Sequence, residues 1–445
     1  MRGSFLDLIG YIFGIWGFFI ILYTVIKSKK NRPKFQIIFF INVFYAIIYG
    51  FAPSAICLYV YNNGGNENPF NYISFTTEGI HNIILFLVAS IVGFVGINFG
   101  YRIKTNTKVA KSIHVTKNGV RIAAFLLMLI GWGSLYLWTK VYGGPIGILP
   151  YANALRAGWD IGIYNPWSFM MKLCPFLQLA TYMFFSQFLT SKNKTDLLMT
   201  VFSGIGAFLY ILANSSRMHF GLFFVILVLI YAGHHKMSKK MYFLCGVVGV
   251  LSLAVMHMGE SIMGVLQNDT VNRSSEVSLN VIEIIRSEFF FPMSSFQTYM
   301  ENIGTGKIGI RIVVDIENAF FSWLPSRFKP SNLVGLEATN TILHSGTTIY
   351  GGLPTDFITT CFYELGSVGL FIFPAIYGYL AKIFEKKIRP FFSNDYFKVI
   401  YVLGVFYFVK AIGYGDPANI MSNIFFLVWG HIFTTVIGRF TIGRK

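Results

Sequence analysis

Long apolar runs with almost no charged residues recur along the whole chain. A helix needs about 17–25 mainly apolar residues to cross the hydrocarbon core of a bilayer. Eleven runs have this length, and we expect each to form a transmembrane helix: 5–26, 35–60, 80–100, 120–141, 166–189, 196–213, 218–234, 241–263, 357–381, 396–413 and 418–438. The sequence therefore predicts an all-α polytopic membrane protein.

The overall composition excludes the main classes of soluble protein. Of the 445 residues, 54% are apolar and only 12% are charged, about half the charged share of a soluble domain. So few polar side chains cannot cover a water-soluble globule, and so many apolar ones exclude a disordered chain. The four cysteines lie in apolar runs without the spacing of a metal site or a disulfide framework: Cys57, Cys174, Cys245 and Cys361. We expect them to be small buried hydrophobic residues.

The net charge of +17 raises the question of a nucleic-acid partner. Most of the Lys and Arg residues, however, gather in alternate short segments: 27–34, 102–121, 192–194, 236–240, 382–398 and 439–445. Basic residues collect on the cytoplasmic side of membrane proteins and set their orientation. We therefore expect a cytoplasmic C-terminus, a periplasmic N-terminus and no nucleic-acid partner.

This orientation divides the chain into three segments. Residues 1–263 hold the first eight predicted spans, and residues 357–445 hold the last three and the tail. Between them, residues 264–356 form one large external segment, which we expect to fold into a helical cap. Two amphipathic helices are predicted within it, at 278–303 and 311–323.

The predicted helix at 311–323 has one apolar and one polar stripe. The apolar residues recur at helical spacing: Ile312, Ile316, Phe320 and Trp323. The polar residues lie on the opposite face: Arg311, Asp315, Asn318 and Ser322. Amphipathic helices outside the bilayer can lie on its surface and cover a cavity. The alternative is a self-contained cap whose charges point into solvent.

Several arginines on the external side have few acidic neighbours in sequence. We rank Arg156, Arg217 and Arg286 first as binding residues, followed by Arg311 and Arg327. A planar guanidinium group suits phosphate and pyrophosphate. The alternatives are that Arg217 extends to lipid headgroups at the end of a span and that Arg311 forms a structural pair with the acid four residues later.

A general base would have to come from the external acids or from the one histidine of the external loops. The principal candidates are Glu337, Asp315 and His344, and other external acids are Asp160, Asp356 and Asp416. A lone histidine is more often structural than catalytic. The sequence shows no carboxylate cluster with metal-ligand spacing, so we expect no metal and no cofactor. It also has no glycine-rich phosphate loop on the cytoplasmic side.

Three local patterns follow one another in the external parts of the chain. They are Tyr142-Gly143-Gly144 with Arg156, then Ser215-Ser216-Arg217, and finally the three motifs at Leu324–Pro330, Tyr350–Asp356 and Glu364–Gly369. In these patterns and in its topology, the chain resembles the Wzy-type O-antigen polymerases, which join oligosaccharide repeat units.

The resemblance implies a GT-C-like membrane fold and a metal-independent glycosyltransferase of the bacterial inner membrane. Such an enzyme transfers the polymer from undecaprenyl pyrophosphate onto a lipid-linked repeat unit at the periplasmic face. Membrane lipids and a chain-length regulator protein are further implied partners. Substrate binding would fall to the five arginines named above and to Tyr350.

Two other functions remain open at this stage. An O-antigen ligase shares the topology and the external arginines, and the sequence separates it poorly from a polymerase. A transporter or flippase of lipid-linked sugars usually has internal repeats and ionisable residues at mid-membrane. We find no similarity between the two halves of this chain, and most of its charges lie at the ends of the predicted spans.

Overall fold

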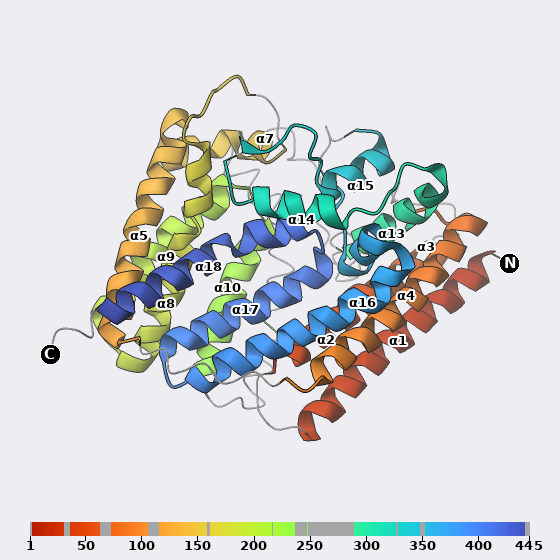
Figure 1. Cartoon of the computed structure of the whole chain (residues 1–445), viewed down its shortest axis with the longest axis horizontal. Coiled ribbons are helices and arrows are strands. Elements are labelled where there is room, and N and C mark those ends of the chain that lie inside the picture. Colours follow the sequence, from red (N-terminus) through yellow and green to blue (C-terminus); the bar gives the residue numbers. More distant parts are fainter. Residues whose placement is uncertain are drawn as a thin grey trace. The chain divides into compact units, whose positions relative to one another are not determined.

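The computed structural model describes residues 2–30, 36–62, 73–105, 115–157, 161–215, 217–235, 247, 289–325, 328–347 and 352–440 (Figure 1). All regular secondary structure in these residues is helical. Eight helices are long and apolar enough to cross a membrane: Phe5–Ser28, Ile37–Asn62, Thr77–Arg102, Lys117–Tyr142, Lys194–Ala213, Phe357–Phe391, Asp395–Gly413 and Pro417–Arg439. The described part of the chain is therefore that of an all-α polytopic membrane protein, as predicted.

The other three predicted spans have different outcomes. His219–His234 is apolar but shorter. The run 166–189 is helical in two pieces, a 3-10 helix η4 (Ser168–Leu173) and the α-helix α8 (Phe176–Ser191). Pro175 separates them, because proline lacks the N–H that a continuous helix would need there. The run 241–263 lies outside the described residues except for position 247.

The chain packs into two compact units, which cut across the three sequence segments. Unit 1 comprises Met1–Thr107, Asn280–Lys386 and Val405–Asn423. Its helices are α1 (Arg2–Lys30), α2 (Ile37–Ala46), the π-helix η1 (Ile47–Phe51), α3 (Ala52–Asn62), α4 (Thr77–Arg102), α13 (Phe291–Asn302), the 3-10 helix η5 (Ile303–Thr305), α14 (Ile312–Phe321), α15 (Leu336–Ser345) and α16 (Phe357–Ile388). It also holds the second half of α17 (Asp395–Gly413) and the first turns of α18 (Pro417–Phe440).

Small residues let the long helices of unit 1 approach one another closely, as is common between helices in membranes. Figure 1 shows α4 alongside α16. A Cβ atom at Gly100 of α4 would overlap the carbonyl oxygen of Ala375 on α16, and one at Gly378 would overlap the carbonyl oxygen of Ile97. The close contact therefore depends on glycine from both helices.

This contact predicts an unequal effect of two glycine-to-alanine substitutions. We expect Gly100→Ala to destabilise the protein by about 1–3 kcal/mol, because a backbone carbonyl cannot move aside as a side chain can. Gly133, in α5 of the other unit, has open space where its Cβ would be, so Gly133→Ala should leave stability unchanged or slightly higher. Thermal unfolding in detergent measures both. Equal midpoints for the two variants would contradict this packing.

The two ends of unit 1 differ in chemistry. At one end, the side chain of Gln297 on α13 binds the start of α4: its Oε1 accepts from Ser74 N at 2.8 Å and its Nε2 donates to Gly79 O at 3.0 Å. At the other end, Lys386 Nζ of α16 donates to Thr105 O at 2.7 Å, just beyond α4. The first end carries the helices of the predicted cap, and the second carries basic residues predicted to be cytoplasmic.

Unit 2 comprises Lys108–Leu279, Lys387–Gly404 and Ile424–Lys445. Its helices are α5 (Lys117–Thr139), η2 (Lys140–Tyr142), α6 (Gly144–Gly147), η3 (Leu149–Tyr151), α7 (Ala152–Ala157), η4, α8, α9 (Lys194–Ala213), α10 (Arg217–His234), η7 (Arg389–Phe391) and the remaining parts of α17 and α18. At the start of α5, Arg121 forms a bidentate pair with Asp196 at the start of α9. The starts of α5 and α9, which are both predicted to be cytoplasmic, therefore lie together within unit 2.

Candidate functional site

Helix α14 carries the most unusual surface of unit 1, because its polar stripe points inward. Asp315 and Asn318 are at most 3% exposed, whereas Val313, Ile316 and Phe320 are 62–74% exposed. In water this arrangement would be unfavourable, since apolar surface is exposed and polar groups are buried. It suits a helix whose outer face contacts lipid. Of the acids on this helix, Asp315 is buried and Glu317 is exposed.

Both ends of α14 are attached to membrane-length helices. At its start, the backbone N–H of Arg311 donates to the carbonyl oxygen of Tyr363 in α16 at 3.2 Å. Beyond its end, Trp323 Nε1 donates to the carbonyl oxygen of Met421 in α18 at 2.6 Å. Helix α14 therefore lies across residues within the first two or three turns of α16 and α18.

The inward stripe of α14 holds a buried ion pair. Arg311 Nε donates to Asp315 Oδ2 at 3.0 Å, and Arg311 Nη2 donates to Asp315 Oδ1 at 2.9 Å and to Val334 O at 2.8 Å. The Asp315 side chain is completely buried and that of Arg311 is largely so. Two parallel hydrogen bonds make this a strongly oriented pair. The geometry gives both residues a structural partner, as the sequence alternative for Arg311 anticipated.

Glu364 lies beside this ion pair, at a break in α16. The backbone leaves helical geometry at Leu365 (φ −140°, ψ 21°) and at Gly366 (φ 61°, ψ −149°). Only glycine adopts the second conformation without strain. The carboxylate of Glu364 is buried, interacts electrostatically with Asp315, Arg311 and Asp416, and has no hydrogen-bond partner among the described residues.

Asp416, in the turn between α17 and α18, ties two helix starts together. Its Oδ1 accepts from Ala418 N at 2.8 Å and its Oδ2 accepts from Glu337 N at 3.2 Å. Acidic groups are favourable at the positive N-terminal ends of helices. Burial nevertheless raises the pKa of the Asp416 carboxyl above its usual range. This residue therefore positions α15 against α18.

Glu337 and Lys410 bring two further charges to the same part of unit 1. Lys410 of α17 is 8% exposed, and its Nζ donates to Asn423 Oδ1 of α18 at 2.9 Å. Its main charged neighbour is Glu337, near the start of α15. We call Arg311, Asp315, Glu337, Glu364, Lys410 and Asp416 the ionic cluster. Sequence reasoning named three of its six residues as candidates, mentioned Asp416 and Glu364 only in passing, and missed Lys410.

His344, at the end of α15, contacts α13. Its Nδ1 lies 2.9 Å from Thr298 Oγ1. The ring is half-buried, and this burial lowers the pKa of His344 below its usual range. Burial therefore favours the neutral imidazole over the charged form. This contact places His344 in the packing between α15 and α13. His344 is not one of the residues of the ionic cluster.

The arginines predicted to bind substrate are only partly described. In unit 2, Arg156 at the end of α7 is exposed, and its Nη1 donates to the carbonyl oxygen of Ser215 at 2.8 Å. Ser215 has a left-handed backbone (φ 46°) in the turn that precedes Arg217, the first residue of α10. Two of the sequence patterns, the one that ends at Arg156 and the one that begins at Ser215, are therefore in contact. The side chain of Arg217 and the whole of Arg286, Arg327 and Tyr350 lie outside the described residues.

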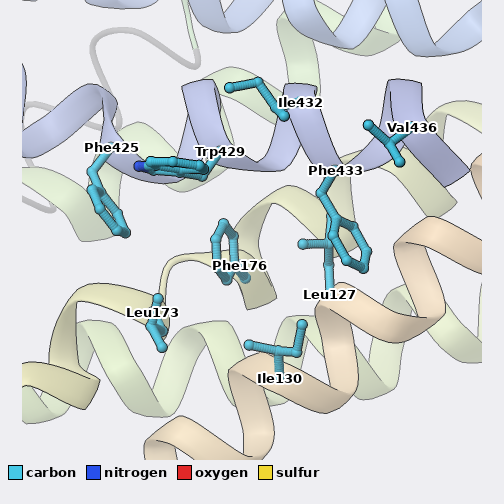
Figure 2. Close-up of a pocket in the computed structure, with 9 residues that line it drawn as sticks. All are labelled: Leu127, Ile130, Leu173, Phe176, Phe425, Trp429, Ile432, Phe433 and Val436. Atoms are coloured by element: carbon cyan, nitrogen blue, oxygen red, sulfur yellow. The ribbon is translucent and has the colours of Figure 1, made fainter.

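Unit 2 also has an apolar groove between α5, α8 and α18, with a volume of about 450 Å³. Its lining has no charged residue: Leu127, Ile130, Leu173, Phe176, Phe425, Trp429, Ile432, Phe433 and Val436. Figure 2 shows the Phe176 ring between the side chains of α18 and those of α5. The volume is that of a small-molecule site, and the lining suits a hydrocarbon chain.

No match emerges when the chain is compared with protein-family models, curated proteins and solved structures. Any functional assignment must therefore come from the residues themselves.

Sequence signals for the missed residues exist but are weak. Lys410 interrupts an otherwise apolar run, and an ionisable residue within a span is costly enough to suggest a function. Glu364 precedes a glycine near the start of a predicted span, which is compatible with a helix break. Neither signal shows that the two residues approach Arg311 and Asp315, because that proximity depends on how α14 crosses α16.

Proposed function

We propose that this protein is a glycosyltransferase that polymerises lipid-linked oligosaccharide repeat units in the bacterial inner membrane. It would take the polymer on undecaprenyl pyrophosphate and transfer it to a lipid-linked repeat unit at the periplasmic face. The proposal includes 11 membrane spans, a GT-C-like arrangement, a periplasmic N-terminus and a cytoplasmic C-terminus. A chain-length regulator would be an additional partner.

The observation that supports this proposal most is the ionic cluster beneath α14. A reaction on a lipid-linked sugar must occur where polar chemistry meets the membrane surface. The ionic cluster has this setting, because its charges lie under a helix with an apolar outer face and beside the ends of membrane-length helices. Irregular backbone such as that at Gly366 is tolerated near the membrane where it is buried in protein or lines a polar cavity.

Two further observations in unit 2 support a lipid pyrophosphate as the leaving group. Arg156 contacts the turn that leads into Arg217, so the proposed cations belong to neighbouring segments. The apolar groove offers a surface for the hydrocarbon chain of the same lipid. Guanidinium groups would stabilise the charge that develops on the departing pyrophosphate, a role that needs no metal ion.

The test measures polymer length in cells and with purified protein. We expect Arg156→Ala and Arg217→Ala to reduce lipid-linked polymer by about 10²–10³-fold, as the loss of a group that stabilises transition-state charge typically does. Arg→Lys variants should recover only part of the activity, because lysine lacks the planar fork. Lys307→Ala removes an exposed cation of unit 1 and serves as a control.

The rival functions give different results in the same experiments. Deleting a polymerase leaves lipid cores that carry one repeat unit, whereas deleting a ligase leaves bare cores. A flippase would move lipid-linked sugar across vesicles without lengthening it. Long polymer in both arginine variants, at normal protein levels, would refute the site assignment.

A further inference from the structure

The buried carboxyl group of Glu364 belongs to the residue two positions before Gly366, at the break in α16. The residue is 5% exposed, and neither of its carboxylate oxygens has a hydrogen-bond partner among the described residues. Two residues further along the chain, a Cβ built on Gly366 would meet no atom within 4 Å. Buried polar groups are almost always hydrogen-bonded, so a buried carboxyl group without a regular hydrogen bond, two residues from a glycine with unfilled space at its Cβ position, calls for a function.

Three other buried acids at this end of unit 1 are already engaged. Asp315 receives two hydrogen bonds from Arg311, and Asp416 receives two from backbone N–H groups. Asp356 accepts from the hydroxyl of Tyr49 at 2.7 Å and from the N–H groups of Ile358 and Thr359 at 3.0 and 3.2 Å. Each of these contacts favours the ionised acid and occupies a lone pair that a base would need, although burial raises the pKa of Asp416.

Glu337, a principal candidate from the sequence, also has a charged neighbour, since Lys410 lies beside it. His344 contacts Thr298 through Nδ1. A general base needs free lone pairs within hydrogen-bond reach of the proton that it accepts. Among these groups, Glu364 lies within hydrogen-bonding reach of the Asp315 carboxyl, but its oxygens receive no N–H or O–H hydrogen bond of regular geometry from the described residues.

We propose that Glu364 is the proton acceptor of the glycosyl transfer, and that the Arg311–Asp315 pair positions it. This inference rests on the proposed function. The acceptor sugar hydroxyl would enter beside Gly366. As its O–H bond breaks, the proton passes to Glu364 and the oxygen forms the new bond to the anomeric carbon of the donor. The bond from that carbon to the pyrophosphate oxygen breaks, and the pyrophosphate leaves with the electron pair.

The charged groups around Glu364 come from three elements. Arg311 and Asp315 belong to α14, Asp416 belongs to the turn between α17 and α18, and Cys361 lies on the same helix as Glu364. Arg311 is held by Asp315 and Val334, which keeps its guanidinium oriented. The backbone N–H of Arg311 donates to Tyr363 O, next to Glu364, and so holds the start of α14 against the break in α16.

The experiment uses the full-length protein in proteoliposomes with a synthetic lipid-pyrophosphate-linked repeat unit. We expect Glu364→Gln to lower the polymerisation rate by about 10²–10⁴-fold, the usual contribution of a general base, while the lipid-linked unit still binds. Glu364→Asp should recover part of the rate. We expect the wild-type rate to fall at low pH and this fall to be absent from the residual activity of Glu364→Gln, because glutamine does not titrate.

Controls separate this role from a structural one. Glu317→Gln removes an exposed carboxylate from α14 and should leave the rate unchanged. Unfolding midpoints of all variants verify that the proteins are folded. A Glu364→Gln rate within about threefold of the wild type overturns the proton-acceptor role. Wild-type protein that binds but never lengthens the lipid-linked unit would instead refute the proposed function itself.

Discussion

Replacing Asp315 with Ala is expected to destabilise the protein by about 3–5 kcal/mol. The substitution leaves the largely buried guanidinium of Arg311 without its carboxylate, and an unpaired buried charge is among the costliest single changes in a folded protein. Asp315 is fully buried and receives two hydrogen bonds from Arg311. Chemical or thermal unfolding in detergent, with tryptophan fluorescence as the probe, measures the loss.

A double replacement of Arg311 and Asp315 separates the effect of this ion pair on stability from its effect on activity. Arg311→Met with Asp315→Leu removes both charges while keeping similar volumes, and such exchanges are often neutral for stability. We expect the double variant to recover most of the stability and to remain inactive, because Glu364 loses the groups that position it. Full activity in a stable double variant would show that the pair is only structural. Glu317→Ala, exposed on the same helix, is the matched control for stability.

Asp356→Ala is expected to cost at least about 3 kcal/mol. Asp356 is buried at the start of α16, where it accepts hydrogen bonds from Tyr49, Ile358 and Thr359. Its removal takes the acceptor from both the N–H and the hydroxyl of Thr359 and one of two acceptors from Tyr49 and from Ile358. Each buried donor left without an acceptor costs about 1–3 kcal/mol. Unfolding in detergent measures the effect, and Asp356→Asn should lose less because its amide oxygen can still accept.

Glu78 provides the matched control for this prediction. It is an exposed acid in the first turn of α4, so Glu78→Ala should change stability by less than about 0.5 kcal/mol. Tyr49→Phe removes one of the donors to Asp356 and should be milder than Asp356→Ala. If Asp356→Ala and Glu78→Ala unfold alike, the hydrogen bonds around Asp356 do not carry the stability assigned to them.

The membrane helices could be predicted from the sequence because apolar length is a local property. Eight of the 11 runs form membrane-length helices in the described residues. The prediction was less accurate at 166–189, where Pro175 divides the run. It also missed the break in α16, where the backbone leaves helical geometry at Leu365 and Gly366 and becomes helical again beyond them.

The candidate site could be predicted only in part. Arg311, Asp315 and Glu337 were identified as single residues with suitable chemistry. The Arg311–Asp315 pair is local, but the other neighbours come from positions far along the chain, since Glu364 approaches Asp315 and Lys410 approaches Glu337. Residue type indicates what a side chain can do, but the availability of its lone pairs depends on which donors surround it in the folded chain.

Helix α14 shows most directly which features could be predicted from the sequence and which depend on the tertiary structure. The periodicity of residues 311–323 determined that one stripe would be apolar and the opposite stripe polar. It did not determine which stripe would face the protein. The fold buries Asp315 and exposes Ile316 and Phe320, because α14 lies across the ends of apolar helices and Arg311 there also donates to Val334 O.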